Sequence, residues 1–288
     1  MARIDQRDPR NAAGEWFVDR RCIDCDTCRE LAPAVFADVG DQSVVGRQPT
    51  TGHDERAAWL AAVACPTASI GTVPRRDRPE GLFPHRLDDG VHLCGWNSED
   101  SFGADSYLVS RPDGNLLVDS PRFTRFLASP IDDLGGIAHV LLTHRDDVAD
   151  AARWADRYGA RVWIHPDDRG AAPFATDLLH QTDPTAIAPG VVAVPVPGHS
   201  RGSAVFAVDD RWLFSGDSLS WNRRTDDLHA FRDACWYSWA HQTRSLERLA
   251  TMVRFEWVMP GHGGRARRPA DEMHDRLVAL VARMRTAA

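Results

Sequence analysis

The stretch from residue 143 to residue 150 reads THRDDVAD and directly follows the apolar run IAHVLL at residues 137–142. That run is short, rich in valine and leucine, and bounded by a glycine and by charged residues, which is typical of a buried strand. One histidine and three carboxylates therefore stand just past a strand end: His144, Asp146, Asp147 and Asp150. Because α/β proteins keep their chemistry at such strand ends, this stretch is the first candidate for a functional site.

Three later strands lead into similar polar groups. The predicted strands at residues 191–196, 212–214 and 255–258 run into the motifs PGH, SGD and MPGH. The residues that end these motifs are His199, Asp217 and His262. A glycine beside each of them permits a sharp turn. Together with the histidine of the first stretch, these side chains can converge at one edge of a sheet.

The N-terminal part of the chain concentrates four of the six cysteines. Residues 22–28 read CIDCDTC, and Cys65 precedes a proline after an alanine-rich segment, residues 54–64, that is predicted to be a helix. Three thiolates at this spacing can wrap three corners of a cubane cluster, and a distant Cys-Pro can supply the fourth. Clustered cysteines in a cytoplasmic protein indicate metal or redox chemistry more often than disulfides.

Over roughly the first 75 residues this part resembles a single-cluster bacterial ferredoxin. The resemblance implies an α+β ferredoxin-like fold and a [4Fe-4S] cluster, with a cysteine rather than an aspartate at position 25 favouring four irons over three. The implied cluster ligands are Cys22, Cys25, Cys28 and Cys65. A zinc site is the alternative, although zinc modules usually take paired C-x2-C knuckles rather than a triple.

A proline-rich, charged segment separates this part from the rest of the chain. Pro74, Pro79 and Pro84 lie among arginines and acidic residues, and proline at that density cannot continue a helix or a central strand. We expect a first domain over residues 1–78, a linker over 79–90 and a second domain over 91–288.

The order and local motifs of the second domain resemble those of the metallo-β-lactamase superfamily. In that family a His-rich loop, a Gly-His-Ser/Thr segment, a Ser/Thr-Gly-Asp and a final Gly-His build a metal site between two β-sheets flanked by helices. The resemblance implies an αββα sandwich. The implied metal ligands are His144, Asp146, His199, Asp217 and His262.

The loop at 143–150 departs from the family pattern, H-x-H-x-D-H. Asp146 stands where the second histidine is expected, Val148 replaces the aspartate and Ala149 replaces the last histidine. Neither valine nor alanine binds a metal, so we expect one zinc or iron ion rather than a full dinuclear zinc centre. Two imidazoles with one carboxylate are also the ligand set of non-haem iron oxygenases.

Three functions follow from this site. In a hydrolase, a metal-bound hydroxide attacks an ester, thioester or amide, and Asp147 or Asp150 accepts the proton. In a redox enzyme, mononuclear iron receives electrons from the ferredoxin cluster. In a non-catalytic protein, the cluster serves electron transfer or sensing. Superfamily frequency favours the hydrolase, whereas the fusion favours redox chemistry, because a hydrolase has no evident use for a cluster.

Composition limits the partners. The 288 residues are 43% hydrophobic and 26% charged, which is enough for a full core, and the net charge of −7 argues against a nucleic-acid or anionic-membrane surface. No apolar run reaches transmembrane length, and the N-terminus lacks the apolar core of a signal peptide. We therefore expect a cytoplasmic protein that takes a small-molecule substrate and a redox partner protein.

Four weaker signals have ordinary interpretations. The G-x-S-x-G pattern at 198–202 would make Ser200 a nucleophile only if a helix followed, but the next run looks like a strand. His165 is predicted to be structural, although it ends a strand as the candidate ligands do. The aromatic cluster around Trp236 is expected to be packing, with a substrate platform as the alternative. Cys94 and Cys235 are expected to be buried apolar residues.

Overall fold

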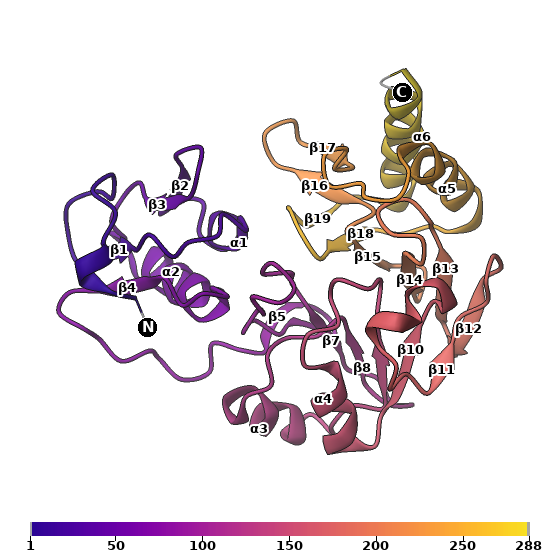
Figure 1. Cartoon of the computed structure of the whole chain (residues 1–288), viewed down its shortest axis with the longest axis horizontal. Coiled ribbons are helices and arrows are strands. Elements are labelled where there is room, and N and C mark those ends of the chain that lie inside the picture. Colours follow the sequence, from indigo (N-terminus) through magenta and orange to yellow (C-terminus); the bar gives the residue numbers. More distant parts are fainter. Residues whose placement is uncertain (1, 287–288) are drawn as a thin grey trace.

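The computed structural model describes residues 2–286, which form a small N-terminal domain and a larger domain joined by an extended segment (Figure 1). Among the described residues, no helix is both long enough and apolar enough to cross a lipid bilayer.

The N-terminal domain is built from short elements around two helices. They are η1 (Ile4–Gln6), β1 (Trp16–Val18), α1 (Thr27–Leu31), β2 (Phe36–Asp38), β3 (Ser43–Val45), α2 (Gly52–Ala64) and β4 (Ile70–Thr72). β1 pairs antiparallel with β4, and β2 pairs antiparallel with β3. The Thr51 hydroxyl caps α2 by accepting a hydrogen bond from the Asp54 amide. The helix predicted before Cys65 is therefore confirmed, and it ends directly before that cysteine.

The extended connection between the domains covers residues 73–84. The next strand, β5 (His85–Asp88), lies inside the range predicted as a linker, because its residues pair antiparallel with β6 (Val91–Leu93). The connection is therefore shorter at its C-terminal end than the proline pattern predicts.

The larger domain contains two β-sheets that face one another, with α3 and α4 outside the first and α5 and α6 outside the second (Figure 1). The first sheet has the strand order β11-β10-β9-β8-β7-β6-β5 and the second β12-β13-β14-β15-β18-β19. The predicted αββα sandwich is thus confirmed. Its remaining strands are β7 (Tyr107–Val109), β8 (Leu116–Val118), β9 (His139–Leu141), β10 (Arg161–Ile164), β11 (Asp177–Leu178), β12 (Thr185–Ala188), β13 (Val191–Pro195), β14 (Ala204–Val208), β15 (Trp212–Gly216), β16 (Ser220–Asn222), β17 (Asp227–His229), β18 (Trp257–Pro260) and β19 (Ala266–Arg267). Its helices are α3 (Arg125–Asp133), α4 (Ala151–Tyr158), η2 (Pro166–Ala171), α5 (Trp239–Met252) and α6 (Ala270–Thr286).

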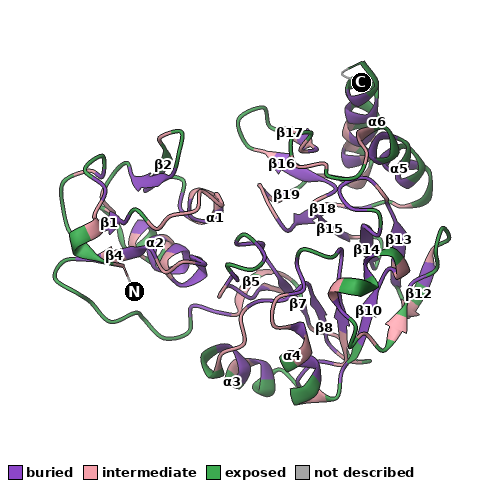
Figure 2. Cartoon of the chain, in the orientation of Figure 1, coloured by how far each residue is buried: buried purple, intermediate pink, exposed green. Residues whose placement is uncertain are grey.

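Both faces of the second sheet are covered, which is why its central strands are continuous apolar runs. Every residue of β14 is buried (Figure 2). Val205 packs with the residues of α5 and α6, while its neighbour Phe206 belongs to the core between the sheets, as the two-residue repeat of a strand requires. Between the sheets, the rings of Tyr107 and Phe214 lie 5.3 Å apart.

The strand ends that carry the candidate ligands meet at one edge of this sandwich. β15 and β18 are parallel, with Gly216 opposite Pro260, and the Gly261 amide donates to the Gly216 carbonyl. The loops that contain Asp217 and His262 are therefore neighbours. β9 and β13 end in the loops that carry His144 and His199.

Candidate metal centres

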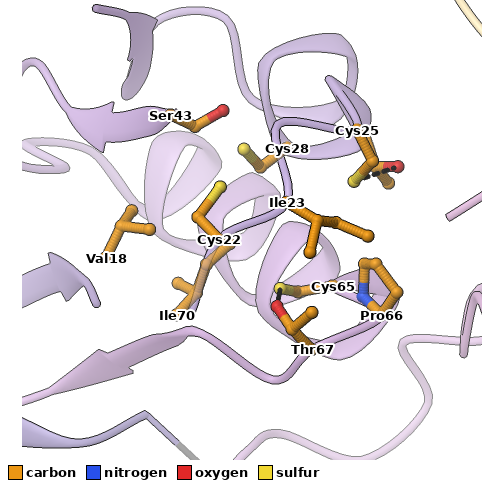
Figure 3. Close-up of a pocket in the computed structure, with 11 residues that line it drawn as sticks. Val18, Cys22, Ile23, Cys25, Cys28, Ser43, Cys65, Pro66, Thr67 and Ile70 are labelled. Atoms are coloured by element: carbon orange, nitrogen blue, oxygen red, sulfur yellow. Dashed lines mark hydrogen bonds between the residues drawn. The ribbon is translucent and has the colours of Figure 1, made fainter. Parts of the chain in front are cut away.

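The first candidate centre is a cavity lined by all four N-terminal cysteines (Figure 3). Cys22 and Cys25 come from the loop before α1, Cys28 from α1, and Cys65 from the residue after α2. All four are free thiols. The loop wraps around the cavity because Asp24 and Asp26 adopt positive φ angles of 59° and 68°, which aspartate tolerates better than most residues.

A salt-bridge network fixes that loop. The Arg29 guanidinium lies 2.6 Å from an Asp24 carboxylate oxygen and 2.5 Å from one of Asp26. The same guanidinium donates to the Ser43 hydroxyl at 2.7 Å, which ties the loop to β3. The three ligands from residues 22–28 are therefore held in place by contacts that do not involve the cluster.

The chemistry of the cavity fits an iron–sulfur cluster. Burial raises the pKa of the Cys22, Cys25 and Cys28 thiols, that of Cys25 to about 11. The neighbouring thiols raise each of these pKa values further. Four thiolates would repel one another here unless cations separated them. The Ser69 amide donates to the Cys65 sulfur at 3.3 Å, and such hydrogen bonds to sulfur also tune a bound cluster.

The second candidate centre lies at the edge of the sandwich, where His144, His199 and Asp217 place one ligand atom each within 4.8 Å of one another. Both histidine Nε2 atoms are 3.6 Å from Asp217 Oδ2. His144 Nε2 and Asp217 Oδ1 are buried and have no hydrogen-bond partner. Unsatisfied buried polar atoms are costly, and a metal ion between the ligand atoms would satisfy His144 Nε2, so this donor set fits one.

A hydrogen-bonded chain orients His144 toward that point. The Thr143 hydroxyl is 3.0 Å from His144 Nδ1 and 2.9 Å from an Asp119 carboxylate oxygen. The Thr143 hydroxyl has one proton, and Asp119 accepts it. The hydroxyl oxygen of Thr143 then accepts the Nδ1 proton of His144, which leaves His144 Nε2 free to bind a metal. Burial lowers the pKa of His144 to about 4, so the ring is neutral at pH 7.

The loop of His199 is held by Asp168. The Ser200 hydroxyl donates to Asp168 at 2.5 Å, and the Gly202 amide donates at 3.2 Å. The strand β14 follows, as the sequence predicts, so Ser200 is a structural donor and not the nucleophile of a hydrolase elbow. His165 is also structural: its Nδ1 accepts from the Asp167 amide and its Nε2 is 3.0 Å from the Gln181 carbonyl oxygen.

Asp146 and His262 flank the three-ligand group. Asp146 Oδ2 is 3.4 Å from His199 Nε2 and 3.8 Å from His144 Nε2, and its side chain is 48% exposed. A hydrogen bond from His199 lowers the pKa of Asp146. His262 Nε2 lies 4.0 Å from Asp217 Oδ2. All five residues predicted as metal ligands therefore gather at this edge, with Asp146 on the solvent side.

The two carboxylates predicted as proton acceptors differ in position. Asp147 is buried, and its Oδ2 is 3.8 Å from His144 Nδ1, on the opposite edge of the ring from the ligand atom. Asp150 accepts a 2.7 Å hydrogen bond from the Phe123 amide and begins α4 as its N-cap. The prediction for Asp150 needs correction, because its carboxylate anchors the loop before α3 rather than facing the ligands.

Among the residues that support or border the ligands, the sequence singled out Trp236 but not Asp119 or Phe102. Asp119 also follows a strand directly, at a φ of 53°, so its position carried the same signal as the ligands. The two most exposed aromatic side chains border the site: Trp236, 71% exposed, lies 6.2 Å from His199, and Phe102, 55% exposed, lies 6.0 Å from His262. The interpretation of Trp236 as packing is therefore wrong.

The remaining cysteines differ from each other. Cys94 is fully buried, as expected. Cys235 is half-buried and its thiol donates to the Gly198 carbonyl at 3.1 Å, so it helps to shape the turn that presents His199.

The support of His144 gives a first testable prediction. In Thr143→Val, the hydroxyl between Asp119 and the imidazole is lost at almost constant volume. We expect the affinity of the second centre for its metal to fall about 10- to 100-fold, the usual cost of removing such a supporting group. Chelator competition measures it. Thr243→Val, which removes another buried hydroxyl, one that donates to the Trp239 carbonyl within α5, serves as control, and equal affinities in both variants would refute the role of Thr143.

Comparisons with known proteins identify the families of both domains. A family model for the 4Fe-4S single cluster domain of ferredoxin I matches residues 18–72, and a model for the metallo-beta-lactamase superfamily matches residues 86–283. YmaE, an uncharacterised protein of Bacillus subtilis, is 26% identical over 160 residues, which is 54% of this chain. The chain spans 57% of the length of that curated relative.

Solved structures with the same sandwich include two metallo-β-lactamases. The enzyme from Hirschia baltica superposes with a TM-score of 0.53 at 18% identity, over 68% of this chain and 96% of the other. FIM-1 from Pseudomonas aeruginosa, solved in a mono-zinc form, gives a TM-score of 0.52 at 19% identity, over 69% of this chain and 93% of the other. At these identities the likeness establishes the fold.

Proposed function

This chain belongs to the metallo-β-lactamase superfamily and carries a [4Fe-4S] ferredoxin domain, and from that premise we propose that it is a redox enzyme. In this proposal the cluster exchanges single electrons with one metal ion held by His144, His199 and Asp217. The observation that carries the proposal is a direct contact between Cys25 of the cluster loop and Gly103 of the larger domain.

The contact at Cys25 leaves no space for a side chain. Gly103 has a φ of +86°, and a Cβ added there would lie 2.9 Å from the Cys25 sulfur. The Thr27 hydroxyl donates to the Gly103 carbonyl at 3.0 Å in a buried position. A second contact lies alongside, where the Arg223 guanidinium is 2.9 Å from a Glu30 carboxylate oxygen. These contacts seat the cluster loop on the larger domain.

The same short loop, residues 97–105, continues to the second centre. Buried Asn97 stiffens it by donating to the Gly103 carbonyl at 2.7 Å and to an Asp105 carboxylate oxygen at 2.9 Å. Next to Gly103, the Phe102 ring lies against His262. The Asp105 amide donates to the Gly261 carbonyl at 2.8 Å. A continuous path of covalent bonds and hydrogen bonds therefore connects the loop of Cys25 to the loops of the second centre.

When bound, the cluster would supply single electrons, and an iron ion at the second centre would supply a redox-active position for the substrate. Two histidines and one carboxylate are the ligand set typical of such iron sites. The protein groups do the rest. Thr143 and Asp119 orient His144, Asp168 holds the loop of His199, and the half-exposed carboxylate of Asp146, whose pKa the hydrogen bond from His199 lowers, places a negative charge on the solvent side of the site. The exposed rings of Phe102 and Trp236 offer apolar surface to a small-molecule substrate.

Hydrolysis is the second candidate, and Asp146 is the observation that favours it. A metal at this site would lower the pKa of a bound water. Of the three carboxylates at residues 146, 147 and 150, that of Asp146 reaches His199 from the solvent side. This mechanism would leave the contact between Cys25 and Gly103 without a role in the reaction, so we rank it below electron exchange.

The experiment compares the wild-type protein with a His144→Ala/His199→Ala variant, both purified anaerobically. We expect about four irons per chain in both and one additional iron in the wild type alone. In the reduced wild type, the nearby paramagnetic iron should shorten the spin relaxation of the cluster in electron paramagnetic resonance, and the variant should lack this effect. A zinc ion with no influence on the cluster would overturn the redox proposal and direct the work to ester and thioester substrates.

The contact itself gives a further prediction. Gly103→Ala places a methyl group against the Cys25 sulfur and strains a positive φ, so we expect a loss of about 1–3 kcal/mol in unfolding free energy. We also expect weaker magnetic coupling between the centres and slower reoxidation of the reduced cluster. Gly40→Ala is the matched control, because Gly40 has a φ of +94° but open space around it. Equal coupling in both variants would show that the centres do not communicate through this loop.

A further inference from the structure

A second cavity also reaches a cysteine of the candidate cluster site in the N-terminal domain. It encloses about 1250 Å³ between α2, the connection 73–84 and the start of α3, and we call it the linker groove. Cys65 and Ile70 line both this groove and the cavity of the four cysteines. The cluster therefore has two distinct approaches, through Cys25 toward the larger domain and through Cys65 toward the linker groove.

The charge of the linker groove is opposite to that of the chain. The whole chain carries −7, whereas the residues that line the groove include five arginines and two carboxylates. The arginines are Arg75, Arg76, Arg78, Arg122 and Arg125, and the carboxylates are Asp77 and Glu80. A local excess of positive charge on an acidic protein attracts an anionic partner.

The groove has the anatomy of a protein interface rather than of a small-anion site. Its inner wall includes the buried aromatic residues Phe17 and Trp59. All its arginines are exposed except half-buried Arg122, so the positive charges form a rim instead of converging on one buried point. An apolar centre with a polar, solvent-accessible rim is typical of protein–protein contacts.

One arginine at the rim is already positioned. The Arg78 guanidinium lies 4.0 Å from the centre of the Phe126 ring and 4.8 Å from that of Trp96. These two rings belong to the larger domain and are stacked at 5.9 Å. The contact fixes the linker against the larger domain, so the rim combines charges from both sides of the groove on a defined surface.

We propose that the linker groove docks a small acidic electron-carrier protein, which reduces the cluster through the Cys65 side. In each transfer the carrier is oxidised by one electron and the cluster is reduced by one, with no bond made or broken. This inference extends beyond the proposed function, because it requires only a redox-active cluster and makes no demand on the metal of the second centre.

The test measures how fast a reduced [2Fe-2S] ferredoxin of net negative charge reduces the holoprotein, followed anaerobically by stopped-flow absorbance. We expect the triple variant Arg75→Glu/Arg78→Glu/Arg125→Glu to lower the second-order rate constant at least about tenfold at low ionic strength. The wild-type rate should fall as salt is added, toward that of the variant, because the Debye length shrinks to ~10 Å at 0.1 M.

A matched control reverses the same number of charges away from the linker groove. Arg153→Glu/Arg244→Glu/Arg285→Glu makes the same change in net charge at exposed positions on α4, α5 and α6, and should leave the rate close to that of the wild type. Dithionite should reduce the cluster equally in all three proteins, which excludes cluster damage. Equal slowing in both triple variants would overturn the docking site. Saturable binding of reduced flavin mononucleotide that depends on the groove arginines would identify a nucleotide site instead.

Discussion

Asp217→Asn should empty the second centre of its metal and leave the cluster in place. Asp217 Oδ2 is the atom shared by the site, 3.6 Å from the Nε2 atoms of His144 and His199 and 4.0 Å from that of His262. Burial alone would raise the pKa of Asp217, but the three imidazoles lower it below the usual value. The site is therefore built around a negative charge that asparagine lacks.

The loss of metal affinity in Asp217→Asn should exceed the 10- to 100-fold reduction that is typical when only a supporting group is removed. Metal analysis after dialysis against a chelator would measure about four irons per chain in the variant and no further metal. Asp150→Asn is the control, because it makes the same chemical change in a carboxylate that accepts a hydrogen bond from the Phe123 amide and does not face the ligands. Retention of the extra metal in Asp217→Asn, or its loss in Asp150→Asn, would contradict this assignment of ligands.

The sequence could identify the candidate ligands that the structure brings together, because their signals are local. Each candidate ligand of the larger domain follows a strand within a few residues, and the two sheets of the sandwich bring these strand ends to one edge. The cysteine spacing at 22–28 similarly encodes a loop that surrounds one cavity. In these cases a short motif determines both the residue type and its approximate position.

The roles of Asp147 and Asp150 could not be predicted, because they depend on the path of one loop. Asp146 and Asp147 are adjacent, yet the first approaches the Nε2 side of His144 and the second the Nδ1 side. Ala149 adopts a positive φ of 34°, and Asp150 then starts α4. Proximity in sequence did not determine which carboxylate would face the ligands.

Contacts between distant segments were also beyond the sequence pattern. The hydrogen bond of Thr27 to Gly103 spans 76 residues, and that of Ser200 to Asp168 spans 32. The neighbourhood of Gly103 in the sequence is not distinctive, and the G-x-S-x-G pattern around Ser200 does not indicate Asp168 as its partner. The fusion of two domains suggested electron exchange, but the structure is needed to show where the domains meet, at Gly103 against Cys25 and at Arg223 against Glu30.

Cys65→Ala should remove the cluster and unfold the N-terminal domain while the larger domain stays folded. The strands of this domain have three residues each and pair only in twos, and two-stranded sheets are marginally stable alone. Cys65 is the ligand that connects the end of α2 to the 22–28 loop. Domains of this size commonly need a metal or disulfides for stability, and structural zinc sites contribute about 10–16 kcal/mol on binding.

Calorimetry should therefore show one unfolding transition for the larger domain in Cys65→Ala, with the N-terminal transition lost and the cluster absorbance absent. Cys235→Ala is the matched control, because this half-buried cysteine lies in the larger domain and its thiol bonds only to a turn carbonyl; it should retain four irons and both transitions. A folded N-terminal domain in apo Cys65→Ala would mean that α2 and the paired strands are stable without the cluster. In that case the network of Arg29 with Asp24 and Asp26 would have to provide the stability assigned here to iron ligation.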